Sequence, residues 1–128
     1  MLVKDVMVKE VVTISPFATL RDAMRLMKRH GLKSLVVEKN MPSDAYGLIT
    51  YTNIVKTVIA ESGDIDLLNV YDVCAKPALS VGKSLAVRHV ADLMTQNRVK
   101  RILVVEDNEL IGLVTMDDIV DILLQEID

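Results

Sequence analysis

The chain contains the same sequence pattern twice. The segment Val3-Lys4-Asp5-Val6-Met7 matches Val70-Tyr71-Asp72-Val73-Cys74, and at the same spacing Leu26-Met27 matches Leu93-Met94. After a loop that is two residues shorter in the second copy, residues 47–55 match residues 112–120. A duplicated supersecondary unit usually forms two similar halves with clefts where they meet. We therefore expect one module of two motifs, residues 1–62 and residues 63–128, with functional groups where the halves meet.

Each copy follows the order strand, helix, strand, strand, helix, which predicts an α+β fold. In the first copy, Thr19 and Asp22 have the spacing of a capping box before an apolar helical stripe, and Gly31 suits the end of that helix. The second copy has Ala86 at the cap position, so Ser84 is the expected start of its helix. The expected strands are residues 11–14, 34–37 and 46–50, then 78–81, 101–105 and 110–115. The last two strands of each copy should pair antiparallel because their connection is short.

Composition excludes several classes of function. The net charge is −3, only 3% of the residues are aromatic, and no basic stripe is visible, so nucleic-acid binding is not expected. No apolar run approaches the roughly 20 residues of a membrane span, and we expect a cytoplasmic protein. Cys74 is the only cysteine, which excludes an internal disulfide and a cysteine-based metal site. Because it replaces Met7 of the first copy, Cys74 is interpreted as a small packed side chain.

A polar pair follows the last strand of each copy, Thr50 with Asn53 and Thr115 with Asp118. Unpaired backbone N–H groups at a helix start attract anions, and a carboxylate one turn further can accept hydrogen bonds from two neighbouring hydroxyls, such as those of a ribose. The same spacing also fits plain helix capping, with Thr as the cap and the acid favourable to the helix dipole. Both interpretations remain open from the sequence.

Basic residues precede the middle strand of each copy, Lys33 in the first and Lys100 with Arg101 in the second. They should lie at the same end of the sheet as the threonine turn. There, Arg101 could bind a phosphate through two hydrogen bonds and Lys100 could act as a point charge. The alternative is that all three are solvated surface charges.

Catalytic motifs are not found in the sequence. The five glycines are scattered, so no glycine-rich phosphate loop is formed, and no Gly-x-Ser-x-Gly turn occurs. His30 and His89 occupy non-equivalent positions without the carboxylate spacing of a metal site. We therefore expect neither a catalytic residue nor a metal, although a small enzyme acting on nucleotides is a weaker alternative.

Taken in order and twice over, these segments resemble a tandem pair of cystathionine β-synthase (CBS) domains, also called a Bateman module. The resemblance covers roughly residues 3–59 and 70–127 and is carried by residues 3–7, 32–37 and 46–55 with their second-copy partners. It implies two β-α-β-β-α motifs related by a pseudo-twofold axis. It also implies that an adenosine-containing ligand, such as AMP, ADP, ATP or S-adenosylmethionine, binds in clefts between the motifs.

The resemblance implies individual roles as well. Asp118 would hold ribose hydroxyls, and Thr115 would face the ribose or phosphate. Lys100 and Arg101 would contact phosphate. The base would be flanked by Leu113 and by residues 6–8, which include Met7 and Val8. The second site would use Thr50, Asn53, Lys33 and Leu48, with residues 73–75 beside the base.

Two departures from the family pattern fall on one site. Asn53 stands where the motif prefers Asp, and Ser34 stands where the second copy has Arg101. Hydrogen bonds to ionised groups are stronger than neutral ones, so we expect the site of Asp118 to bind more tightly. Asp117, next to Asp118, would repel a long polyphosphate, which favours AMP over ATP.

The sequence thus predicts a non-catalytic regulatory module that binds an adenine nucleotide as its regulatory ligand and acts on an unknown target protein. An apolar stripe on the last helix predicts a homodimer and comprises Ile119, Ile122, Leu123 and Ile127. The alternative is an interaction or dimerisation module with no small-molecule ligand.

Overall fold

The computed structural model describes residues 1–127 and divides into two compact units. Unit 1 combines Met1–Val11 with the chain from Leu79 onward, and unit 2 is Val12–Ala78. Residue 128, at which the second predicted motif ends, lies outside the described residues. The compact units therefore differ from the sequence repeats, because the opening segment of each copy belongs to the unit that contains the strands of the other copy.

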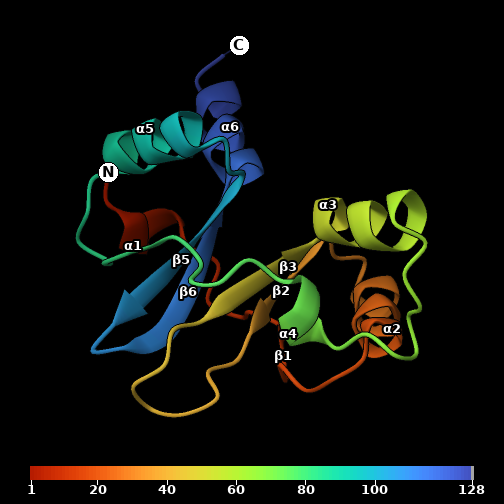
Figure 1. Cartoon of the computed structure of the whole chain (residues 1–128). Helices are drawn as coiled ribbons and strands as arrows, with labels where there is room; N and C mark the ends of the chain where they lie inside the picture. Colours follow the sequence, from red (N-terminus) through yellow and green to blue (C-terminus); the bar gives the residue numbers. More distant parts are fainter. Residues whose placement is uncertain (128) are drawn as a thin grey trace. The chain divides into compact units, whose positions relative to one another are not determined.

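Unit 2 contains one three-stranded sheet with helices (Figure 1). Its elements in chain order are β1 (Thr13–Ile14), α2 (Leu20–His30), β2 (Ser34–Val37), β3 (Gly47–Thr50), α3 (Tyr51–Ile54), the π-helix η1 (Val55–Ala60) and α4 (Val70–Val73). Strand β1 is parallel to β2, and β2 is antiparallel to β3. The predicted antiparallel pair is confirmed, and β1 is shorter than the predicted strand 11–14.

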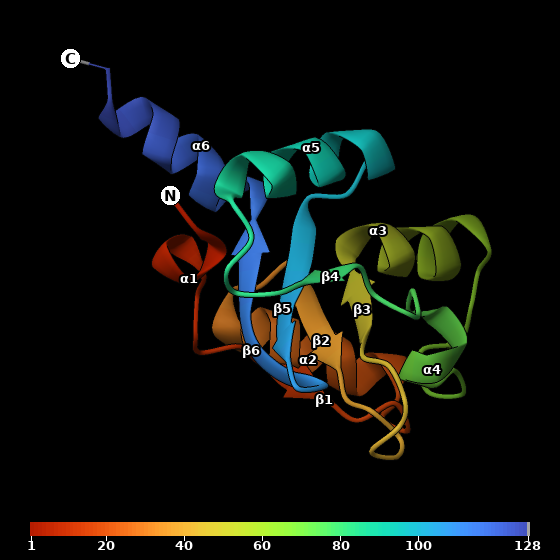
Figure 2. The ribbon, with the colours of Figure 1, turned by 90° about the vertical axis from the view of Figure 1, so that its left-hand side faces the viewer.

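Unit 1 repeats this architecture (Figure 2). Its elements are α1 (Val3–Val6), β4 (Ser80–Val81), α5 (Val87–Asn97), β5 (Arg101–Glu106), β6 (Glu109–Thr115) and α6 (Met116–Gln125). Strand β4 is parallel to β5, and β5 is antiparallel to β6. The short helices α1 and α4 are not in the predicted element order, since four-residue helices have almost no periodicity to read.

Each unit has its own aliphatic core, and the opening helix of each copy completes it. Val3 of α1 is fully buried among residues of α5, β5 and β6. Val70 of α4 is fully buried in the corresponding cluster around α2, β2 and β3. Burying a valine side chain contributes about 1.5–3 kcal/mol, so each short helix is held mainly by this contact and not by helix propensity.

The first long helix of each copy begins differently. The capping box predicted for α2 is confirmed, since the Asp22 backbone N–H donates to Thr19 Oγ1 at 3.1 Å and the Thr19 N–H donates to Asp22 Oδ2 at 3.1 Å. Gly31 ends α2 with φ 63°, as predicted. The predicted start at Ser84 is wrong, because α5 begins after Ala86 with no side-chain cap. The Val87 N–H donates instead to the Met1 carbonyl, at 3.0 Å.

The apolar stripe on α6 is exposed only in part. Ile119 is buried in the core of unit 1, which corrects its assignment to an exposed stripe. Leu123 is 59% exposed and Ile127 73%, while Ile122 is half-buried. Among residues 1–127, no helix has the length and apolar character that crossing a membrane requires.

Candidate functional site

The candidate site of unit 1 lies where β6 passes into α6. Thr115 is the cap of α6, and its Oγ1 accepts a hydrogen bond from the Asp118 N–H at 3.1 Å. The Asp118 carboxylate bonds back through Oδ2 to the Thr115 N–H at 3.0 Å. Thr115 and Asp118 therefore do cap α6, as the capping interpretation predicts. This bond engages Oδ2, and Asp118 Oδ1 has no hydrogen bond within residues 1–127.

The opening segment of the chain lies beside this junction. Val8 and Leu113 exchange two backbone hydrogen bonds, of 2.9 and 3.0 Å, and so form a short antiparallel bridge. A Cβ at Gly112 would lie 2.8 Å from Met7 Sδ and 3.0 Å from the Val8 carbonyl oxygen. Position 112 must therefore be glycine for Met7 and Val8 to approach the strand this closely.

The basic residues of unit 1 lie next to the threonine turn. Arg101 pairs with Thr115 in the register of β5 and β6, and the Lys100 carbonyl accepts a hydrogen bond from the Met116 N–H at 2.8 Å. Arg101 is half-buried, and Lys100 is exposed. The structure thus brings together, within one unit, the candidate residues Met7, Val8, Lys100, Arg101, Leu113, Thr115 and Asp118.

Unit 2 repeats the arrangement at the end of β3. Leu48 exchanges two 2.9 Å backbone hydrogen bonds with Ala75, as Leu113 does with Val8. Ser34 pairs with Thr50 in the sheet, and the Tyr51 N–H donates to the Lys33 carbonyl at 3.0 Å. The candidates Lys33, Leu48, Thr50 and Asn53 are therefore also brought to one strand end.

The two junctions differ in their hydrogen bonds. Asn53 Oδ1 accepts from the Thr50 N–H at 2.9 Å and from the Thr50 hydroxyl at 3.1 Å. The Thr50 hydroxyl proton is thus directed at Asn53. In unit 1, the hydrogen bonds between Thr115 and Asp118 use backbone N–H donors only. Unit 1 therefore offers an ionisable acceptor, whereas the remaining side-chain group of Asn53 is an amide donor.

Cys74 stands beside the junction of unit 2. It is half-buried against the core of that unit, and its Sγ lies 3.3 Å from the position of a Cβ at Gly47. Burial raises the pKa of the Cys74 thiol, although the charge of Lys76 opposes this. A raised thiol pKa disfavours the nucleophilic thiolate, and the interpretation of Cys74 as a packed side chain agrees with this.

The two histidines are exposed and lie on different helices, His30 at the end of α2 and His89 in the first turn of α5. Within residues 1–127, no group of three or more His, Cys, Asp or Glu side chains is arranged to hold a metal ion.

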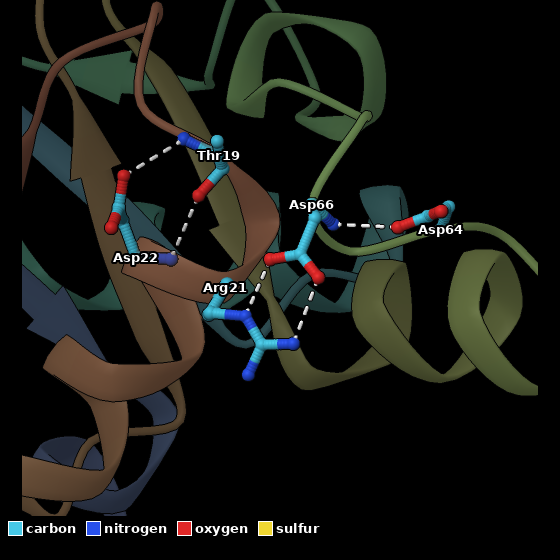
Figure 3. Close-up of polar contacts among 5 residues, drawn as sticks. All are labelled: Thr19, Arg21, Asp22, Asp64 and Asp66. Carbon is cyan, nitrogen blue, oxygen red and sulfur yellow. Dashed lines mark hydrogen bonds and ion pairs between the residues drawn. The ribbon is translucent and has the colours of Figure 1, made fainter.

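Sequence reasoning missed three contacts in unit 2. Arg21 forms an ion pair with Asp66, shown in Figure 3. Lys76 pairs with Asp44, and its hydrogen bond is the main cause that lowers the pKa of Asp44 to about 2. Phe17 contacts Tyr71. Each contact joins residues far apart in sequence, so no local pattern could have revealed it.

Comparisons with known proteins agree with the duplicated architecture. The chain is 38% identical to the hexameric CBS-CP12 protein from bloom-forming cyanobacteria, with a TM-score of 0.88 over 94% of this chain and 66% of that chain. It is 31% identical to the uncharacterized protein MK0525 of Methanopyrus kandleri, over 94% of this chain and 61% of the relative. The chain thus spans about two thirds or less of the length of these relatives.

A more distant structure has the same fold. The CBS domain pair of protein MJ0100, solved in complex with 5′-methylthioadenosine and S-adenosyl-L-methionine, is 22% identical, with a TM-score of 0.86 over 98% of each chain. The family model of the CBS domain matches residues 3–60 and 70–125, one match for each copy of the repeat. The chain therefore belongs to the CBS domain family and contains two CBS domains in tandem.

Proposed function

We propose that this chain is a non-catalytic regulatory module that binds an adenosine-containing ligand at the strand–helix junction of unit 1. The ligand would lie against the opening segment of the chain and the start of α6. The junction of unit 2 would be a weaker second site. The CBS domain pair of MJ0100, which has the same fold, is solved with two adenosine-containing ligands, and this supports the proposed class of ligand.

The observation that carries the proposal is the convergence at the end of β6. The Val8–Leu113 bridge places the opening segment two residues before Thr115 on β6. Thr115 caps α6, and the first turn of this helix carries the Asp118 carboxylate. In the proposed complex, Asp118 Oδ1 accepts hydrogen bonds from ribose hydroxyls. The base lies against Met7, Val8 and Leu113, which supply apolar contact and backbone hydrogen-bonding groups.

The basic residues would bind the phosphate. Arg101 is paired with Thr115 in the sheet, so the Arg101 side chain is attached to β5 directly beside the junction. Lys100, one residue earlier, adds a second positive charge. Asp117 is exposed in the first turn of α6 and adds a negative charge beside the same turn. This combination favours a monophosphate over a triphosphate, and we propose AMP as the preferred nucleotide.

Regulation would follow from the position of the opening segment. Residues 1–11 are covalently joined to unit 2 but pack in unit 1. A ligand that contacts Val8 and Asp118 together would stabilise the docked arrangement of this segment by differential binding. The occupied and empty forms would then present different surfaces to a target protein.

A thermal-shift experiment tests the proposal. The wild-type chain is heated with AMP, ADP, ATP, S-adenosylmethionine and 5′-methylthioadenosine, with GMP as the base control. At a hundredfold excess over Kd, binding should stabilise the chain by about 2.7 kcal/mol. The shift should be lost in Asp118→Asn, which keeps the capping geometry that Asn53 shows in unit 2. It should persist in Asp121→Asn, an exposed position further along α6.

Two results would contradict the proposal. One is the absence of a shift with every adenosine compound. The other is an equal loss of the shift in Asp118→Asn and Asp121→Asn, which would indicate a general charge effect on α6.

A second candidate function is supported by the exposed apolar end of α6. Leu123, Leu124 and Ile127 are all exposed there, and unpaired apolar patches mark interaction surfaces. We propose homodimerisation through this helix, with or without a ligand; the 38% identical cyanobacterial protein is described as hexameric. Light scattering on wild type and Leu123→Lys tests it. A monomer at high micromolar concentration in wild type would contradict it.

A further inference from the structure

Unit 2 exposes an aromatic pair in a chain with few aromatic residues. Phe17 is 61% exposed and Tyr71 is 53% exposed, and their rings meet edge to face with centroids 6.1 Å apart. Aromatic residues make up only 3% of the sequence, so the core is built without them. Two large rings that contact each other and still face solvent leave apolar area available for a partner.

The pair flanks a short antiparallel backbone pairing, called the ladder below, between residues 16–20 and residues 68–71, the last two of which begin α4. Thr19 and Asn69 form its central bridge, and the Val70 N–H donates to the Ala18 carbonyl at 2.8 Å. The Tyr71 N–H donates to the Pro16 carbonyl at 3.0 Å. Val70, the first residue of α4, is buried in the core, whereas the neighbouring Tyr71 and its ring partner Phe17 remain exposed.

Unit 1 contains the same ladder without aromatic residues. Leu2 bridges Ala86, and the Lys4 N–H donates to the Lys83 carbonyl at 2.9 Å. In the alignment of the copies, Lys4 and Ser84 occupy the positions of Tyr71 and Phe17. The backbone of this ladder therefore forms with polar side chains. Packing alone does not explain why unit 2 has two rings there.

Two carboxylates are anchored at the bridge between the same segments. Asp72 Oδ2 accepts from the Asn69 N–H at 2.9 Å, just as Asp22 Oδ2 accepts from the Thr19 N–H at 3.1 Å. Both carboxylates are thus bonded to the backbone of the Thr19–Asn69 bridge, whose residues are two positions from Phe17 and Tyr71. The unit 1 counterpart of Asp22 is His89, so this pair of acids is also specific to unit 2.

The arginine that precedes Asp22 in the sequence is already engaged. As Figure 3 shows, Arg21 points toward Asp66, and its Nη2 donates to Asp66 Oδ2 at 2.9 Å. The Asp66 N–H in turn donates to Asp64 Oδ1 at 2.8 Å. The hydrogen bond from Arg21 lowers the pKa of Asp66, which keeps that carboxylate ionised. Arg21 therefore pairs with Asp66, and within residues 1–127 it forms no ion pair with Asp22.

We propose that Phe17, Tyr71, Asp22 and Asp72 form a docking surface for an arginine-bearing segment of a partner protein. A guanidinium stacks on an aromatic face and at the same time pairs with a carboxylate through two hydrogen bonds, which suits rings and acids in neighbouring positions. A second copy that docked through its α6 would not suit this surface, because α6 carries Asp117 and Asp121 and contains no arginine. This surface shares no residue with the proposed nucleotide sites, so either proposal can fail alone.

The experiment is an NMR titration of the ¹⁵N-labelled full chain with the peptide (Arg-Ala)4. Saturable shifts are expected at residues 17–22 and 69–72. The double variant Phe17→Ser/Tyr71→Lys carries the residues that unit 1 has at the equivalent positions. Because unit 1 forms the same backbone hydrogen bonds with these residues, the variant should still fold. It should bind about two- to fivefold more weakly, since an exposed cation–π contact contributes about 0.5–1 kcal/mol. Tyr51→Ser removes another exposed tyrosine and should bind as wild type does.

The acids are tested separately. The double variant Asp22→Asn/Asp72→Asn keeps a side-chain oxygen at each cap. It should bind (Arg-Ala)4 more weakly than wild type, and its affinity should depend less on salt concentration. The peptide (Lys-Ala)4 should bind more weakly than (Arg-Ala)4, and (Glu-Ala)4 should not bind. Three results would overturn the proposal: no saturable shift in wild type, shifts confined to the acidic helix α6, or equal affinity of wild type and Phe17→Ser/Tyr71→Lys.

Discussion

Thr50 with Asn53 and Thr115 with Asp118 cap helices in the same way, yet they differ in charge. Both threonines accept a hydrogen bond from the backbone N–H three residues later, and both partner side chains bond back to the threonine N–H. Either residue type satisfies the hydrogen bonds of the helix start, so these bonds do not explain why unit 1 has an ionisable carboxylate. The comparison separates what the fold requires from what a ligand would use. Loss of the two caps should therefore affect stability equally, whereas the two junctions should differ in ligand binding.

The largest expected effect concerns the opening helices. Val3→Ala and Val70→Ala each remove a fully buried side chain and should destabilise the chain by about 2–3 kcal/mol. Hydrogen exchange should localise the loss in opposite units, on β5 for Val3→Ala and on β2 for Val70→Ala. The exposed Val120→Ala is the control and should change little. Loss of protection in the same unit for both variants would contradict the assignment of these helices.

The next effect concerns the two close approaches of the opening segments to the return strands. An alanine Cβ at position 112 would lie 3.0 Å from the Val8 carbonyl oxygen, and one at position 47 would lie 3.1 Å from the Ala75 carbonyl oxygen. Gly112→Ala and Gly47→Ala should each cost about 1–3 kcal/mol by overpacking.

Gly112→Ala should be the more damaging of the two, because Met7 Sδ would lie at only 2.8 Å. Urea unfolding provides the free energies of unfolding. Gly82→Ala, whose Cβ would meet only the Glu106 side chain, is the milder control. Full stability in Gly112→Ala would show that the Val8 bridge is not held as closely as described.

Removing the caps should have equal effects in the two units. Thr50→Ala and Thr115→Ala each delete the side-chain acceptor at a helix start and should cost about 1 kcal/mol. Thermal denaturation measures this. If the two variants lose the same free energy of unfolding, any difference between them in ligand binding cannot be attributed to stability.

The smallest effect is a pH dependence confined to unit 2. The hydrogen bond from Lys76 lowers the pKa of Asp44 from 3.8 to about 2. A depressed carboxyl pKa contributes stability above the unfolded-state pKa and loses it as the pH falls through the folded-state pKa. The stability advantage of wild type over Asp44→Asn should therefore shrink between about pH 4 and pH 2. Lys76→Met should lose the same dependence, and an acid unfolding curve of wild type that coincides with both variants would exclude this contribution.

Much of the fold could be predicted because each expected helix and strand is supported by the matching segment of the other copy. The antiparallel strand pairs and the Thr19 capping box follow from local patterns that the structure confirms. The start of α5 could not be predicted from local preference. Ser84 is a good cap by type, but the Met1 carbonyl satisfies the Val87 N–H and the helix begins later. Tertiary contacts there outweigh propensity.

The exchange of opening segments could not be predicted either. Sequence similarity shows that Val3 and Val70 are equivalent, but it does not reveal with which sheet each one packs. The predicted motifs 1–62 and 63–128 therefore mark the two copies of the sequence repeat, whereas the compact units have different boundaries. The candidate site was accessible to sequence reasoning because Thr115, Asp118, Lys100 and Arg101 are close in sequence or at the ends of paired strands. The Phe17–Tyr71 pair was not, since it depends on the ladder between distant segments.

Calorimetric titration with AMP on reciprocal variants tests the central difference between the units most directly. Asp118→Asn gives unit 1 the side chain of unit 2, and Asn53→Asp does the reverse; neither removes a capping oxygen. The account predicts that Asp118→Asn loses the tighter site and that Asn53→Asp strengthens the weaker one. If both variants bind AMP as wild type does, or if Asn53→Asp weakens binding as much as Asp118→Asn, the carboxylate of Asp118 does not distinguish the sites.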